Sequence, residues 1–538
     1  MNRRVFLWNS SISGAGAALV GRFSQGQNLP GKANSLREFE LDEMPITGLQ
    51  KAMERGEYSA RQITELYIRR IEEIDGDGPT LRSILELNPD ALDIARDLDR
   101  ERKENGPRGP LHGIPVVLKD NLDTADRMTT TAGSLALKGS IPARDSFVAQ
   151  RLRSAGAVIL AKANLSEWAN FRSRRSTSGW SARGGQCRNP YVLDRNPCGS
   201  SSGSAVAVSA QLCSVAIGTE TDGSIVCPAN ANGVVGLKPT VGLVSRAGII
   251  PISHSQDTAG PITRTVTDAA VLLGALSGFD ARDPATLAGR GRSTEDYTFD
   301  LNPEGLKGAR VGIARQFFGF HEKVDRLMED SILEMRRCGA EVIDPTDIPT
   351  RGEFGDSEYK VMLFEFKANL NAYLKGLGPE VSVKSLQEVI AFNEQHRDVE
   401  MPYFGQDIFL EAQAKGPLTS EEYLEALARN HRLSRIEGID FVMERFRLDA
   451  IVAPTGGPAW KTDLINGDPS SGGSSSCAAV AGYPNISVPV GFVHDLPVGI
   501  SFFGRAWSEP TLIKLAYSFE QATQARSKPR FLPTMDLY

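Results

Sequence analysis

Short apolar runs alternate with helix-type patterns in the first half of the chain. From Ser59 onward apolar residues recur at helical spacing, and Ser59 with Gln62 forms a capping-box sequence, so we expect a helix that ends at Gly76. Runs rich in β-branched residues predict strands at 115–119, 157–161 and 214–218. Between them, helices are expected around 147–152 and over 204–212. This alternation is typical of an α/β sheet.

The second half resumes the alternation after a polar interruption. Residues 280–303 show no helix or strand periodicity and are rich in Arg, Gly, Asp and Thr, which predicts a long surface loop. Residues 350–440 carry mainly polar helical patterns. The remaining apolar runs predict a helix at 324–338 and strands at 309–314, 340–343, 448–453, 485–490 and 498–503.

Composition and charge indicate a folded, mildly acidic protein. Hydrophobic residues make up 41% of the chain and charged residues 23%, which is enough apolar material for a sizeable core. The net charge of -6 provides no broad positive field for a phosphate backbone. Nucleic acid is therefore not an expected partner.

The first 43 residues differ from the rest of the chain. Arg3 and Arg4 precede a short apolar run, which resembles a twin-arginine export signal over residues 1–26, and residues 27–43 look like an unstructured lead-in. Because the run is shorter than the roughly 18 residues of a spanning helix, no stable membrane anchor is expected. We expect export to the periplasm or the medium; the alternative is a frayed terminus of a cytoplasmic protein.

The cysteines predict no metal site. They form no C-x-x-C pair and have no zinc-ligand spacing. An exported protein can hold disulfides, but a chain with a large core does not require them, so buried free thiols are expected. The six cysteines are Cys187, Cys198, Cys213, Cys227, Cys338 and Cys477.

Most of the candidate catalytic residues lie between residues 196 and 240. Serines and glycines gather at 199–204, which opens an apolar helix, and at 219–224, which follows a predicted strand. Glycine-rich turns in such places let successive backbone N–H groups converge on an anion or a developing oxyanion. The two clusters therefore predict two serines that face one pocket.

A serine hydroxyl needs a base before it acts as a nucleophile. The six histidines are scattered and form no paired motif, so Lys119 is the stronger candidate. It ends an apolar strand, and burial there disfavours the ammonium form and lowers the pKa. The alternative is a lysine that is solvated or paired with Asp120.

Three motifs in this order resemble the amidase signature family, and within it the bacterial peptide amidases. They are L-H-G-I-P-V-V-L-K-D-N at 111–121, G-A-V-I-L-A-K-A-N-L-S-E at 156–167 and the block 196–240. The resemblance runs from about Met44 to the C-terminus and implies an amidase domain over 44–538. It also implies a single large α/β domain with a central mixed β-sheet covered by helices on both faces, and no cofactor or metal.

The resemblance assigns roles to individual residues. The family lysine falls on Lys119 as the base, the relay serine with its cis peptide bond on Ser200, and the nucleophile on Ser224. The backbone N–H groups that hold the oxyanion fall on Thr221, Asp222 and Gly223. Because T-D-G-S stands here where many members have I-G-G-S, the Asp222 carboxyl group must point away from the oxyanion.

These assignments predict a serine amidohydrolase that cleaves small-molecule or peptide amides, C-terminal peptide carboxamides among them, through an acyl-enzyme. One alternative is an amidotransferase subunit that generates ammonia for a partner enzyme acting on charged tRNA. A second is a non-catalytic binder, and a third is a nucleophile elbow at 199–203 with Ser201, although residues 196–198 break the strand that an elbow needs. Pocket walls are expected at 170–175 and 364–409, where the aromatic residues are equally expected in the core.

Overall fold

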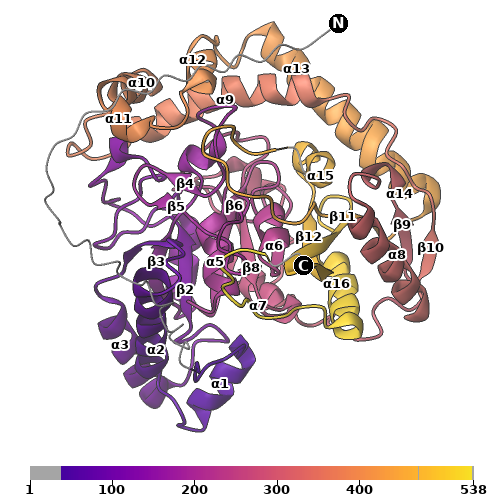
Figure 1. Ribbon diagram of the computed structural model, residues 1–538, viewed down its shortest axis with the longest axis horizontal. Helices are drawn as coiled ribbons and strands as arrows, with labels where there is room; N and C mark the ends of the chain where they lie inside the picture. The colour runs from indigo at the N-terminus through magenta and orange to yellow at the C-terminus, as the bar shows by residue number, and fades with distance from the viewer. Residues whose placement is uncertain (1–37, 470–471, 536–538) are drawn as a thin grey trace, which may run out of the picture. The chain divides into compact units, whose positions relative to one another are not determined.

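An eleven-stranded mixed sheet forms the centre of the computed structural model, which describes residues 38–469 and 472–535 (Figure 1). Its strands are β1 (Ile84–Leu87), β2 (Pro115–Lys119), β3 (Val158–Ala163), β6 (Val215–Glu220), β7 (Val235–Lys238), β8 (Thr258–Thr263), β9 (Arg310–Ile313), β10 (Glu341–Ile343), β11 (Ala450–Pro454), β12 (Asn485–Val493) and β13 (Leu496–Phe503). They lie in the order β1-β3-β2-β6-β8-β7-β12-β13-β11-β9-β10. A separate small hairpin pairs β4 (Trp180–Ser181) with β5 (Gly185–Gln186).

The strand directions divide the sheet into two parallel groups. β2 is parallel to β3 and β6, and β9 is parallel to β10 and β11. The strands that join the two groups are antiparallel, and so is the edge strand β1. The predicted strands are thus confirmed, with ends that shift by a few residues, and so is the α/β class with a mixed sheet.

Helices cover both faces of the sheet. In the described residues they are α1 (Ile46–Glu54), α2 (Ala60–Ile71), α3 (Ala91–Asn105), α4 (Phe147–Ser154), α5 (Ser202–Ser209), α6 (Val226–Ala231), α7 (Val266–Leu276), α8 (Glu322–Arg337), α9 (Gly355–Lys375), α10 (Leu386–Gln395), α11 (Arg397–Glu400), α12 (Asp407–Gln413), α13 (Glu421–His431), α14 (Asp440–Phe446), α15 (Ser475–Ala481) and α16 (Glu509–Thr523). α5 and α6 contact each other on the strands, while α4, α7, α16 and α8 form another continuous layer. The capping box at Ser59 is present, and a π-helical segment over Glu72–Asp77 continues α2 past its predicted end.

Small residues let α5 pack against backbone rather than side chains. Every residue of α5 is buried, and a Cβ atom at Gly203 would lie 2.3 Å from the carbonyl oxygen of Ser83. Contacts of that length are sterically forbidden, so only glycine fits this position. The close packing fixes the N-terminal end of α5, where Ser200 and Ser201 lie.

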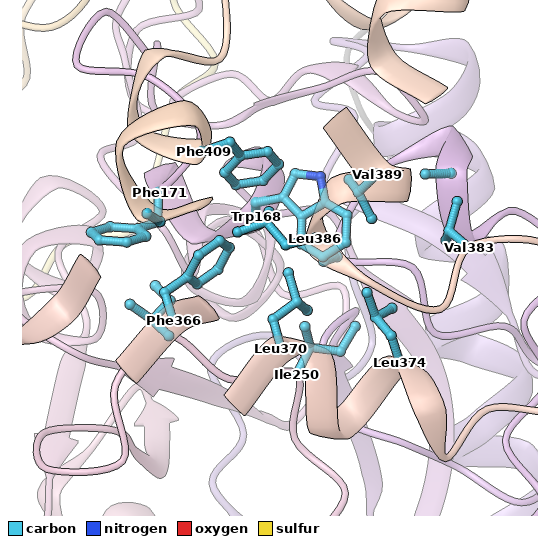
Figure 2. Close-up of a cluster of buried hydrophobic side chains, with 14 of the residues drawn as sticks. Trp168, Phe171, Ile250, Phe366, Leu370, Leu374, Val383, Leu386, Val389 and Phe409 are labelled. Atoms are coloured by element: carbon cyan, nitrogen blue, oxygen red, sulfur yellow. The ribbon is translucent and has the colours of Figure 1, made fainter. Parts of the chain in front are cut away.

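The segment α9 to α14 forms a helical layer that runs along one end of the sheet (Figure 1). Its apolar side chains pack on Trp168 and Phe171 from the sheet region, as Figure 2 shows. The centre of the Phe409 ring lies 5.7 Å from the centre of the Trp168 ring and 5.2 Å from that of the Phe366 ring. The aromatic residues that were candidates for a pocket wall at 364–409 are therefore mainly core residues here.

One pair of cysteines contradicts the expectation of free thiols. Cys198 and Cys227 form a disulfide that spans 29 residues of sequence, whereas the other four cysteines are free. The first half-cystine lies two residues before Ser200 and the second lies three residues after Ser224. The pairing depends on tertiary contact between the two serine clusters, which sequence spacing does not reveal.

Residues 40–538 form one compact unit. The predicted export signal at 1–26 and most of the predicted lead-in at 27–43 lie outside the described residues. Over the part of the chain that the structure describes, no helix combines the length and apolar character needed to cross a membrane.

Candidate active site

Two of the predicted site residues are in direct contact. Lys119 ends β2, Ser200 lies just before α5, and both side chains are fully buried. The Lys119 ammonium nitrogen donates a hydrogen bond of 2.7 Å to the Ser200 hydroxyl, across 81 residues of sequence. The peptide bond between Gly199 and Ser200 is cis, as the resemblance implies.

Burial favours the neutral amine of Lys119, whereas its hydrogen bonds and nearby carboxylates favour the ammonium form. Its nitrogen also donates to the side-chain and backbone oxygens of Thr219, at 2.8 and 3.2 Å. Burial lowers the pKa of Lys119 to about 7, although the negative charges of Asp257 and Glu220 oppose this shift. A large fraction of the side chain is thus ready to accept a proton at neutral pH.

The alternative pairing of Lys119 with Asp120 is not what the structure shows. Asp120 follows the last residue of β2, and its carboxylate has other partners. The Asp120 carboxylate accepts hydrogen bonds from Thr131 and Arg183 instead. The hydrogen bonds that Lys119 donates within the described residues therefore go to hydroxyl and carbonyl oxygens, and none goes to a carboxylate.

Ser224 approaches this pair through its backbone. Its carbonyl oxygen accepts a hydrogen bond of 3.2 Å from the N–H of Ser201. The side chain is partly exposed, and within the described chain no hydrogen bond joins its hydroxyl to that of Ser200. Ser201 itself is occupied, since its hydroxyl donates to the Thr219 carbonyl at 3.0 Å and accepts from the Thr219 N–H at 3.1 Å. These contacts make Ser201 a structural residue and leave Ser224 accessible.

The turn before Ser224 presents backbone N–H groups. Gly223 has a φ of 77°, a left-handed conformation that glycine adopts without steric cost. Outside the helix and strand ladders, no carbonyl of the described chain accepts a hydrogen bond from the N–H of Thr221, Asp222 or Gly223. Beyond Ser224, the N–H groups of Ile225 and Val226 donate to the Glu220 carboxylate. The turn is therefore held at Ile225 and Val226, whereas the N–H groups of residues 221–223 have no acceptor among these backbone contacts.

The Asp222 carboxyl group points to α15 and α9. It accepts a hydrogen bond of 2.5 Å from Ser475, and it hydrogen bonds to Glu358. Burial, followed by the charge of Asp222, raises the pKa of Glu358 well above its usual range, so the protonated form of Glu358 is favoured. Gln256 ties this pair to the turn by donating to Glu358 at 3.0 Å and to the Thr221 carbonyl at 3.3 Å.

A cavity of about 410 Å³ reaches Ser200, while Ser224 is not among the residues that line it. Its inner end is formed by Asn121, Ser200, Thr219 and Thr221. The predicted wall segment 364–409 contributes only part of α9. The remaining lining residues are Ala169, Arg246, Ala247, Ile249, Ile250, Pro251, Ile252, His254, Asp257, Thr258, Arg282, Asp283, Asn369, Ala372 and Tyr373.

The other predicted wall, 170–175, does not line this cavity. Phe171 belongs to the core cluster, and Arg172 is buried in an ion pair with Glu167. The loop 246–258, which sequence reasoning missed, takes that place. Asp257 anchors the loop because it accepts hydrogen bonds from the N–H groups of Ile252 and Ser253 and from the Thr221 hydroxyl.

A buried carboxylate of α9 holds the same loop from the other side. Glu365 accepts hydrogen bonds from the Ser253 hydroxyl at 2.6 Å, the Ser255 N–H at 3.0 Å and the Tyr423 hydroxyl at 2.7 Å. Asn369 and Tyr373 of the same helix face the cavity. The helical layer thus shapes the cavity and fixes one of its loops.

Comparisons with known proteins identify the family of this chain. The Amidase family model matches residues 62–513. A protein of Arabidopsis thaliana named "probable amidase" is 46% identical, covering 93% of this chain and 95% of its own. A glutamyl-tRNA(Gln) amidotransferase subunit from Thermoanaerobacter pseudethanolicus is 33% identical, covering 91% of this chain and 99% of its own.

Among solved structures, a peptide amidase in complex with the competitive inhibitor chymostatin is similar, with a TM-score of 0.89 and 52% identity. The match covers 91% of this chain and 100% of that one. Sequence, fold and the matched family model agree over most of the chain. The chain belongs to the amidase signature family, whose enzymes hydrolyse amide C–N bonds.

Proposed function

We propose that the protein is a serine amidohydrolase in which Ser224 is the nucleophile, Ser200 the proton relay and Lys119 the base. The observation that carries the proposal is the 2.7 Å hydrogen bond between Lys119 and Ser200, made by a buried amine whose pKa is lowered to about 7. A neutral amine in contact with one hydroxyl can draw a proton through it from a second hydroxyl. The proposed second hydroxyl is that of Ser224, whose side chain is half-buried.

In the first half of the reaction, the Ser224 oxygen bonds to the amide carbon. Its proton passes to Ser200, and the Ser200 proton passes to Lys119. The free N–H groups of Thr221, Asp222 and Gly223 support the oxyanion that forms. When the C–N bond breaks, the proton on Lys119 returns through Ser200 to the leaving nitrogen, and an acyl-enzyme remains.

In the second half, water repeats the sequence against the acyl-enzyme. The water oxygen bonds to the acyl carbon while its proton passes through Ser200 to Lys119. The bond to Ser224 then breaks, and the proton returns to the Ser224 oxygen. The carboxylic acid leaves, and all three side chains regain their initial protonation states.

C-terminal peptide carboxamides are the substrates that we propose. The chain shares 52% identity with a peptide amidase, and that protein has been crystallised with the competitive inhibitor chymostatin. The cavity walls supply apolar contacts from the loop 246–258 and polar groups from α9, which suits a side chain next to a polar peptide group.

Export is proposed for the same protein. The support is the Arg3–Arg4 pair ahead of a short apolar run, together with a disulfide, which persists in oxidising compartments. Cell fractionation of a strain that produces the full chain tests this. The Arg3→Lys/Arg4→Lys variant should stay in the cytoplasm, and an unchanged distribution between the fractions contradicts the export signal.

An ammonia-generating role beside a partner enzyme is the second candidate function, favoured by the 33% identity over 99% of the glutamyl-tRNA(Gln) amidotransferase relative. A panel of amides, with peptide amides beside simple acyl amides and glutamine, separates the two functions. The amidohydrolase cleaves peptide amides without a partner protein. Glutamine hydrolysis that depends on a partner supports the amidotransferase role.

Site-directed variants test the residue roles. Lys119→Ala should lower kcat/KM by about 100- to 10,000-fold at pH 7, the usual contribution of a general base. A serine-directed fluorophosphonate probe should label Ser224 in the wild type and in a Ser201→Ala control, but not in Ser224→Ala. Labelling at Ser201 supports the nucleophile elbow, and absence of labelling in folded protein supports the non-catalytic binder.

A further inference from the structure

Gln256 contacts the turn that precedes Ser224 from outside the cavity. Its side chain is fully buried and does not line the cavity, whereas Thr221 does. The Gln256 amide nitrogen donates two hydrogen bonds, of 3.3 Å to the Thr221 carbonyl oxygen and of 3.0 Å to the Glu358 carboxyl group. An amide nitrogen carries two hydrogens, so these two contacts use both of its donors.

The contact with the Thr221 carbonyl sets the direction of the next N–H along the chain. The peptide bond between Thr221 and Asp222 is trans. Because the C=O and the N–H of a planar trans peptide point in opposite directions, the Asp222 N–H points away from Gln256. This N–H is one of the proposed oxyanion donors, and outside the helix and strand ladders no carbonyl of the described residues accepts a hydrogen bond from it.

Side-chain contacts hold the same peptide at both of its ends. At one end, the Thr221 hydroxyl donates a hydrogen bond of 2.6 Å to Asp257. At the other end, the Asp222 carboxylate accepts a hydrogen bond of 2.5 Å from Ser475, and protonated Glu358 donates a second one to it. Rotation of this peptide plane therefore breaks contacts on either side of it.

The backbone of Gln256 is itself held by hydrogen bonds. Its N–H and the N–H of Asp257 both donate to the Ser253 carbonyl oxygen, at 3.0 and 2.8 Å. The Asp257 carboxylate in turn accepts hydrogen bonds of 2.8 Å from the N–H groups of Ile252 and Ser253. The loop 252–257 is thus closed on itself and gives the Gln256 side chain a fixed base.

We propose that Gln256 is a positioning residue that aims the N–H of Asp222 at the oxyanion. This inference rests on the proposed function and assigns a role in it to a side chain outside the cavity. A donor that is aimed before the reaction stabilises the developing negative charge without a reorganisation cost. Loss of a whole oxyanion donor costs roughly 100- to 1,000-fold in kcat, so a donor that loses its aim should cost less, about 10- to 100-fold.

The test begins with Gln256→Met, which keeps the length of the side chain, adds no charge and removes both donors. Its kcat/KM for N-acetyl-phenylalanine amide should fall by about 10- to 100-fold. Two inhibitors of the same skeleton then separate an aimed donor from general packing. One is the trifluoromethyl ketone, and the other is the alcohol obtained by its reduction.

The ketone mimics the tetrahedral intermediate. The Ser224 oxygen bonds to its carbonyl carbon, the carbonyl electron pair moves to the oxygen, and the serine proton passes through Ser200 to Lys119. The alcohol has no carbonyl group and binds without an oxyanion. In Gln256→Met the inhibition constant of the ketone should therefore rise by about the factor by which kcat/KM falls, while that of the alcohol stays within about 3-fold.

Gln406→Met is the matched control. Gln406 is also buried, and its amide nitrogen also donates to one backbone carbonyl, of Ile390, and to one glutamate, Glu394, both at 3.1 Å. It does not line the cavity, so this variant should keep the ratio of the two inhibition constants. If Gln256→Met does not fold, Gln256→Asn, which is too short to hold both acceptors, takes its place with the same expectation.

The inference and the proposed function fail in different ways. A wild-type protein that cleaves no amide, and that binds the ketone no better than the alcohol, contradicts the amidohydrolase itself. An unchanged inhibition constant of the ketone in the Gln256 variant overturns the inference. Equal weakening of ketone and alcohol overturns it as well, because it indicates a general distortion of the cavity instead of the loss of one aimed donor.

Discussion

Removing the disulfide between Cys198 and Cys227 should lower the free energy of unfolding by an amount set by the length of the loop that it closes. The bridge closes a loop of 29 residues. In the chain-entropy treatment, such a closure removes about 12 cal/mol/K from the unfolded chain, or about 3.6 kcal/mol at 25 °C. Unfolding entropy of about 2.1 cal/mol/K per residue gives roughly 1 kcal/mol/K for a unit of this size, so Tm should fall by about 3 to 4 °C.

The assay is scanning calorimetry of the oxidised protein, the dithiothreitol-treated protein and the Cys198→Ala/Cys227→Ala variant. Cys338→Ala, at a partly exposed free cysteine, is the control and should leave Tm unchanged. Thiol titration of the oxidised protein in denaturant should find four reactive groups, the number of free cysteines. Six reactive thiols, or a Tm that reduction does not move, would refute the reasoning.

Four further outcomes are expected. kcat/KM should fall as the pH drops below about 7, because Lys119 then becomes protonated; a flat profile from pH 5 to 8 would contradict its role. Lys119→Met should be inactive but more stable at pH 7 in urea unfolding: the shift from 10.5 to about 7 corresponds to on the order of 5 kcal/mol, partly offset by lost hydrogen bonds. Because the pKa of Glu358 is raised in the folded state, its contribution to stability declines as pH rises above 4.5, so Glu358→Gln should gain more urea resistance, relative to wild type, at pH 8 than at pH 5; an equal difference at both would contradict the raised pKa. Gly260→Ala should cost more than about 2 kcal/mol in the same assay, since its Cβ would lie 2.1 Å from the Leu237 carbonyl oxygen.

The local sequence pattern predicts much of this fold, but it does not predict strand β8. Buried parallel strands such as β2 and β3 are short, mainly apolar runs that contain adjacent β-branched residues, a pattern that sequence reveals directly. β8 reads T-A-G-P-I-T, and its glycine and proline are typical of a loop. The structure explains the glycine, because Gly260 crosses so close to the backbone of β7 that no side chain fits.

In the candidate site, too, some residues could be predicted from the sequence and others could not. Lys119 could be predicted as a base from its place at the end of a buried strand, and the structure confirms its burial and its contact with Ser200. The partner of Asp222 could not be predicted, because Glu358 lies more than one hundred residues away on a helix of ordinary polar pattern.

Helix α9 limits how freely the substrate range of the protein can be altered. Asn369 and Tyr373 border the cavity, while Glu358 and Glu365 of the same helix hold the turn before Ser224 and the loop 252–257. A laboratory evolution campaign that reshapes this helix to admit bulkier substrates will therefore disturb turnover as well as selectivity. Libraries confined to Ile249, which lines the cavity but lies outside both α9 and the loop 252–257, separate the two properties better.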